Sequence, residues 1–139
     1  MTILAAHHSS APAIADILNT AAELLRVNGM YADDYWDDAC YQEWRPGMPL
    51  DPTGAIAVAL DVTTGGGVIR LLGHVDYTVR DPQPAELHPV FQAVFTHLGI
   101  DPDHEDAVTR WFAWCDRQVC HTVIATYRAC AAALQAVPA

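Results

Sequence analysis

The stretch DPTGAIAVALDVTTGGG, residues 51–67, decides the fold of this chain. Its apolar run GAIAVALDV, residues 54–62, is short and continuous, so hydrophobic periodicity does not separate a buried strand from a buried helix. Either Asp51 or Thr53 is placed to cap a helix start, and the glycines after Thr64 break any element. The run is therefore a helix that leads into a strand, or one arm of a β-hairpin about the glycines.

The next segment, VIRLLGHVDYTVR at residues 68–80, alternates apolar and polar side chains in the way that a half-buried strand does. Its apolar positions are Ile69, Leu71, Val75, Tyr77 and Val79, with Leu72 as the exception to the alternation. This segment predicts a minor β-element in the middle of the chain, whichever structure the preceding run adopts.

Helical spacing of apolar side chains dominates the two ends of the chain. Residues 11–28 show it most clearly, with Ser10 as the cap, Pro12 in the first turn and Gly29 as the stop. The same spacing predicts further helices over residues 86–98, from a cap at Asp103 to about Trp114, and over residues 118–135.

The length of 139 residues predicts a single globular domain over residues 1–139, with residues 1–9 as a flexible N-terminus. Hydrophobic residues make up 52% of the chain, which excludes the disordered class. No apolar run approaches the length of a transmembrane helix. The N-terminus lacks the basic and apolar regions of a signal peptide, so we expect a cytoplasmic protein.

Acidic residues outnumber basic residues by 17 to 7, and all seven bases are arginine. The formal net charge of −10 argues against direct binding to nucleic-acid phosphates and to anionic membranes, because both require a basic surface. The same charge favours a basic protein partner. A homo-oligomer is compatible with the sequence.

Four stretches occur in an order that resembles a family of small uncharacterised proteins of high-GC bacteria and their phages. They are LLRVNGMY (24–31), PLDPTGAIAVAL (49–60), RWFAWCD (110–116) and TVIATYRACAAAL (122–134). The chain departs from the family pattern at Cys115, which replaces the Asn of a Trp-Asn-Asp triplet. It also lacks the family's Gly-Arg-Thr loop and the usual cysteine in the GAIAVAL run.

The resemblance implies a helix over residues 55–63 and an association with phages, and it implies no activity. With that helix, we expect a mainly α fold: a compact single domain of about four helices, with a minor β-strand or hairpin element in the middle.

The segment MYADDYWDDACYQEW, residues 30–44, combines aspartates with aromatic side chains. Tyrosine and tryptophan are enriched at binding hot spots, and carboxylates around them select a basic partner. A solvated loop whose aromatic rings pack on the core explains the same residues without a partner. The EF-hand spacing of a calcium loop is absent. The candidate partner-binding residues are Asp33, Asp34, Tyr35, Trp36, Asp37 and Asp38.

Candidate metal and catalytic groups lack the spacing of known sites, so we expect no metal and no cofactor. Cysteines 40, 115, 120 and 130 form no CxxC pair, and the acidic run DPDHED at residues 101–106 is typical of a helix start. Cys115 or Cys120 with His121 could form a nucleophilic set, but the sequence favours the interpretation that these cysteines are buried structural thiols.

These observations favour a non-enzymatic acidic interaction or accessory protein, associated with phages or mobile elements. It would bind a basic protein partner, conceivably as a nucleic-acid mimic. The alternative is a small hydrolase or metal-dependent enzyme that uses a His/Asp/Cys set.

Overall fold

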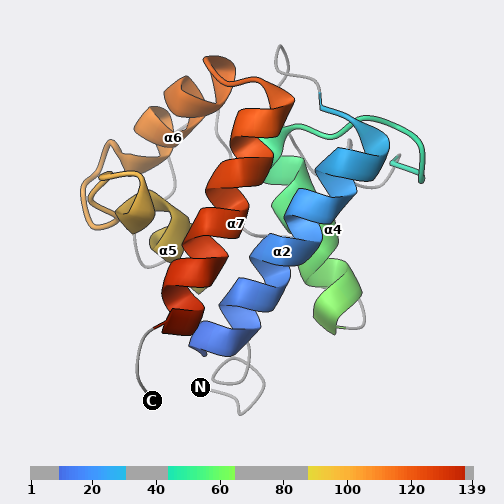
Figure 1. Ribbon diagram of the computed structural model, residues 1–139. Helices are drawn as coiled ribbons and strands as arrows, with labels where there is room; N and C mark the ends of the chain where they lie inside the picture. Colours follow the sequence, from blue (N-terminus) through green and yellow to red (C-terminus); the bar gives the residue numbers. More distant parts are fainter. Residues whose placement is uncertain (1–9, 31–43, 65–87, 137–139) are drawn as a thin grey trace.

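The computed structural model describes residues 10–30, 44–64 and 88–136 of the chain (Figure 1). These ranges hold five helices: α2 (Ala11–Asn28), α4 (Pro52–Thr64), α5 (Pro89–His97), α6 (Ala107–Asp116) and α7 (Cys120–Ala136). The mainly α fold is confirmed, with one helix more than the expected four. The described ranges contain no strand, only an isolated parallel bridge between Met30 and Leu50. The predicted strand at 68–80 and the N-terminal residues 1–9 lie outside them.

The ambiguous run is helical, and it forms α4. The Asp51 Oδ1 atom accepts a hydrogen bond from the Gly54 N–H at 2.5 Å, and the Asp51 carbonyl accepts one from the Ala55 N–H at 2.9 Å. Asp51 is therefore the cap, and the helix starts at Pro52, three residues earlier than expected. Every residue from Asp51 to Leu60 is buried, so α4 has no solvent-facing stripe that a periodicity could reveal.

The bounds of α2 are those that the sequence predicts. The Ser10 Oγ atom accepts a hydrogen bond from the Ala13 N–H at 3.3 Å, which caps the helix. Gly29 ends it with a φ of 84° and donates its N–H to the Leu25 carbonyl at 2.8 Å. One face is buried, through Ile14, Ala15, Ile17, Leu18, Ala21, Ala22 and Leu25.

The later helices differ from the prediction at their starts. α6 begins at Ala107 and not after Asp103, because the intervening residues form turns that precede the helix. α7 begins at Cys120 and not at residue 118, and Val119 lies ahead of the helix and is 54% exposed. The buried face of α7 is formed by Val123, Tyr127, Cys130 and Ala131.

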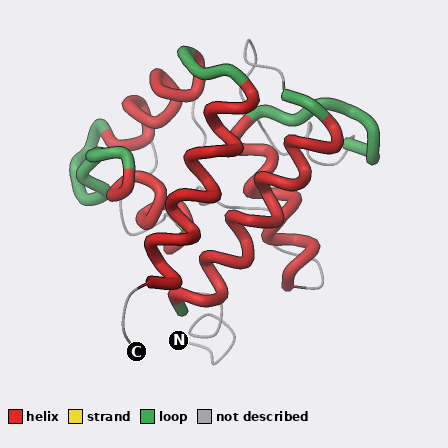
Figure 2. Tube along the Cα trace, in the orientation of Figure 1, coloured by secondary structure: helices red, strands yellow, loops and turns green. Residues whose placement is uncertain are grey.

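The helices form one bundle in which α2 and α7 lie side by side, with α4 behind α2 (Figures 1 and 2). α2 packs more extensively against α7 than against any other helix, and next against α4. α5 and α6 lie on the other side of α7 (Figure 1). A cluster of aromatic rings from α5 and α6 fills that side of the core, with Phe91, Phe95 and Trp111 fully buried.

Two buried hydrogen bonds attach the first turn of α4 to the other helices. The Tyr127 hydroxyl on α7 donates to the Pro52 carbonyl at 2.7 Å, and the Trp111 Nε1–H on α6 donates to the Thr53 Oγ1 atom at 3.0 Å. Both donors and Thr53 are buried, so water is not available to replace either bond. These bonds fix where α4 sits among its neighbours.

We expect Tyr127→Phe to lower the free energy of unfolding by about 1–2 kcal/mol, because the variant removes the donor to a buried carbonyl and leaves the ring in place. Chemical denaturation followed by circular dichroism measures this loss. The control on the same helix is Thr126→Val, whose hydroxyl bonds only to the Thr122 carbonyl one turn back, and it should cost less than about 0.5 kcal/mol. Equal losses in the two variants would contradict a special role for the bond to α4.

Candidate functional site

The predicted partner-binding residues lie outside the described part of the chain. They are Asp33, Asp34, Tyr35, Trp36, Asp37 and Asp38. Their role as a recognition surface remains a prediction, and the structure supplies only the residues on either side of them.

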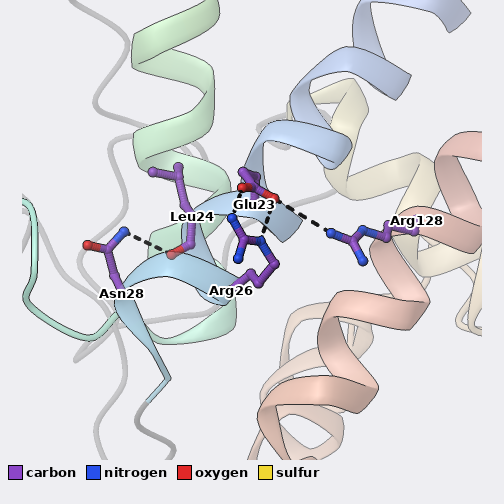
Figure 3. Close-up of polar contacts among 5 residues, drawn as sticks. All are labelled: Glu23, Leu24, Arg26, Asn28 and Arg128. Carbon is purple, nitrogen blue, oxygen red and sulfur yellow. Dashed lines mark hydrogen bonds and ion pairs between the residues drawn. The ribbon is translucent and has the colours of Figure 1, made fainter.

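The two ends of the acidic–aromatic segment are held close together at the C-terminal end of α2. The Gly47 N–H donates to the Asn28 Oδ1 atom at 2.6 Å, and the Leu50 N–H donates to the Gly29 carbonyl at 3.1 Å. Asn28 also donates its side-chain N–H to the Leu24 carbonyl at 2.9 Å (Figure 3). The described residues on either side of the segment therefore lie at the same end of α2.

Trp44 is the one aromatic residue of the segment that the described ranges include. It is half-buried against the core, and its Nε1–H donates to the Met48 carbonyl at 2.9 Å. This is the arrangement that we expected for the aromatic residues of the segment, a ring on the body of the protein with its polar atom satisfied.

A second acidic surface is described completely. The acidic loop, which we define as residues 101–106 between α5 and α6, has exposed carboxylates at Asp101, Asp103, Glu105 and Asp106. The Asp101 Oδ1 atom accepts the Asp103 N–H at 2.9 Å. This bond stabilises a turn and not the predicted helix start. Within the described residues, no group of three or more His, Cys, Asp or Glu side chains is placed to hold a metal ion.

Arginine neutralises a different carboxylate, on the face that α2 shares with α7. Glu23 accepts hydrogen bonds from two nitrogens of Arg26, and its Oε2 atom lies 3.6 Å from the Nη2 atom of Arg128 (Figure 3). The hydrogen bond from Arg26 lowers the pKa of Glu23. By contrast, the acidic loop has no arginine within ion-pair distance in the described structure, and its one ion contact is from His104 to Asp106 at 3.9 Å.

The three cysteine thiols in the described ranges lie in surroundings that oppose reactivity. Cys115 is buried, and its pKa is raised well above the ordinary value by desolvation and then by the charges of Asp51 and Asp116. Desolvation raises the pKa of Cys130 to about 11 and also raises that of Cys120, which is half-buried. A nucleophilic cysteine needs a lowered pKa, so these three thiols match the buried, structural interpretation.

Sequence reasoning missed two polar side chains that act at helix starts. The His88 Nδ1 atom accepts a backbone N–H within the first turn of α5. The His104 Nδ1 atom accepts the backbone N–H of the residue directly before α6. The available signal was their position, since each stands just ahead of a helix start, where an Asp, Asn or Ser is the usual acceptor.

We expect Cys115 and Cys130 to resist a maleimide reagent near pH 8 in the folded protein and to react fully after denaturation. For Cys130 the rise in pKa from 9.0 to about 11 leaves about a hundredfold less thiolate than a free cysteine has. Cys120 is more accessible and should react first of the three. Mass spectrometry of digested protein measures each site separately, and fast labelling of Cys115 would contradict the buried assignment.

No helix in the described ranges is long and apolar enough to cross a membrane. Comparison with curated proteins and with solved structures gave no significant match to either. A family model does match residues 9–133, which include α2, α4, α5 and α6 and all of α7 except its last turn. The chain therefore belongs to DUF6197, a family of unknown function.

Proposed function

We propose that this protein is a non-enzymatic accessory protein that binds a basic protein partner through its acidic surface. The observation that carries the proposal is that, in the described ranges, no arginine lies within ion-pair distance of the exposed carboxylates of the acidic loop. Arg26 and Arg128 both contact Glu23, which lies on α2 and not in the acidic loop. The acidic charge is thus directed at solvent, where it attracts a basic protein over long range.

The contact surface in this proposal is the acidic–aromatic segment, with Asp33, Asp34, Tyr35, Trp36, Asp37 and Asp38 as its residues. Residues 31–43 contain five acidic residues, four aromatic residues and no arginine. The described residues support the proposal because they hold both ends of this segment at one place, through Asn28 and Gly29. Fixed ends reduce the entropy that a segment loses when it binds.

Several finer features belong to the same proposal. The resemblance to proteins of high-GC bacteria and their phages supports a role in a phage or mobile element, acting in the cytoplasm. A dense array of carboxylates is also suited to occupy a DNA-binding surface in place of phosphates, which makes a nucleic-acid mimic one form of this function. The alternative, a small hydrolase or metal-dependent enzyme, gains no support from the raised pKa values of Cys115 and Cys130.

The test compares two fourfold variants that change the net charge equally. One is Asp33→Asn, Asp34→Asn, Asp37→Asn and Asp38→Asn together. The other, in the acidic loop, is Asp101→Asn, Asp103→Asn, Glu105→Gln and Asp106→Asn. The wild-type chain is first used to capture proteins from the native host, and the captured partner is identified. The rates at which this partner associates with the wild-type chain and with each variant are then measured at low and high salt.

We expect the first variant to slow association about tenfold or more at low salt, with little change in thermal stability. The acidic-loop variant should slow association less. It removes the same amount of charge, but its carboxylates do not belong to the segment whose aromatic side chains contact the partner in this proposal. Equal slowing by both variants would show long-range attraction without a defined site. A loss of several kcal/mol of folding stability in the first variant would show that its carboxylates are paired inside the fold, which would contradict the proposal.

A further inference from the structure

The first turn of α5 is closed by a histidine ring. His88 precedes the helix with an extended backbone, and its Nδ1 atom accepts the Val90 N–H at 3.1 Å. The His88 carbonyl accepts the Phe91 N–H at 2.9 Å. The His88 side chain therefore accepts the N–H two residues later in the chain, and the His88 carbonyl accepts the N–H three residues later.

The same arrangement recurs before α6. The His104 Nδ1 atom accepts the Asp106 N–H at 3.0 Å, and the His104 carbonyl accepts the Ala107 N–H at 3.1 Å. Asp106 occupies the cap position of α6 but forms no capping bond with its own side chain. The turn that leads into α6 therefore depends on the histidine.

Asp101 provides a third copy of this turn without a histidine. Its Oδ1 atom accepts the Asp103 N–H at 2.9 Å, and its carbonyl accepts the His104 N–H at 3.1 Å. This is the usual turn formed by Asp and Asn side chains. The comparison shows that the geometry needs only an acceptor atom, and it indicates which substitutions keep the turn.

An imidazole accepts at Nδ1 only when that nitrogen carries no proton, so both bonds require a neutral ring with its proton on Nε2. Protonation removes the acceptor at Nδ1. It also places a positive charge beside the N-terminal end of a helix, where the helix dipole is already positive. Both effects act in the same direction, against the first turns of α5 and α6.

Other charged and titratable groups near the two histidines also bear on the effect of pH on these turns. Asp106 Oδ2 lies 3.9 Å from the Nδ1 atom of His104. The remaining carboxylates of the acidic loop belong to the same connection between the helices. His97 is the last residue of α5, and Arg110 lies in the first turn of α6. Glu86 precedes His88 by two residues in the sequence.

The two helix starts are joined through the aromatic cluster. The ring centroids of Phe91 on α5 and Trp111 on α6 are 5.9 Å apart, and those of Phe95 and Trp111 are 5.7 Å apart. Trp111 in turn stacks on Trp114 with an interplanar angle of 16° and a separation of 5.5 Å. A change in the position of either helix therefore alters the surroundings of the tryptophans.

We propose that His88 and His104 form a proton-sensitive device that loosens the first turns of α5 and α6 as the pH falls below neutrality. The neutral rings support the turns at higher pH, and this support is lost as the rings gain protons. The device is independent of the proposed partner binding.

The experiment follows backbone amides by NMR between about pH 7.5 and pH 5, the range in which histidine titrates. In the wild-type chain, we expect the exchange protection of the Val90 and Asp106 amides to fall about fivefold across this range. The Asp103 amide, held by Asp101, is the internal control and should keep its protection. Long-range nitrogen spectra should show both rings with the proton on Nε2 at the higher pH.

The test variant is His88→Asn with His104→Asn, because asparagine keeps an acceptor for the turn and does not titrate. The pH dependence of the Val90 and Asp106 amides should disappear in it. The matched control, His97→Asn with His121→Asn, changes two exposed histidines for which the structure records no cap bond, and it should behave as the wild type does. A proton on Nδ1 at the higher pH, or an unchanged pH dependence in the test variant, would overturn the proposal.

Discussion

The position of α4 is the constraint on which the rest of the structure depends. A helix that is buried on every side through its first turns has no polar face to orient it, and apolar packing by itself is tolerant of sliding and rotation. The hydrogen bonds from Tyr127 and Trp111 remove that freedom, because each buried donor is satisfied in one position of α4 only. α6 and α7 are thereby fixed relative to one another as well, since both bond to the same turn.

The distribution of chemical groups follows from this arrangement. Two ionisable groups near the first turn of α4, Cys115 and Tyr127, are buried, and desolvation raises the pKa of each, so neither is suited to proton or group transfer near neutral pH. The surface, by contrast, carries carboxylates that the described arginines do not neutralise. The interaction function that we propose uses the surface carboxylates and needs neither of these two buried groups.

The sequence predicted those features that depend on local patterns. α2 was predicted to the residue because Ser10, Gly29 and one apolar face all agree. α4 was ambiguous because complete burial removes the contrast between faces, and only the resemblance to a family favoured a helix. The start of α6 was misplaced because a turn that uses the side chains of Asp101 and His104 competes with the helix for the same N–H groups. The candidate binding residues lie outside the described ranges, so only the anchoring of their ends is known.

The pairing of α2 with α7 has a consequence for how the chain is made. The helix that packs most extensively against α2 is the last one described, so the part of α2 that α7 covers has no permanent cover while the residues between them are being synthesised. At ordinary ribosome speeds, a separation of about 100 residues takes about 5–20 s to translate. During that interval this part of α2 presents the kind of apolar surface that chaperones recognise. Completion of the core is therefore timed by translation of the C-terminal helix, and the nascent chain has to be kept from aggregating until then.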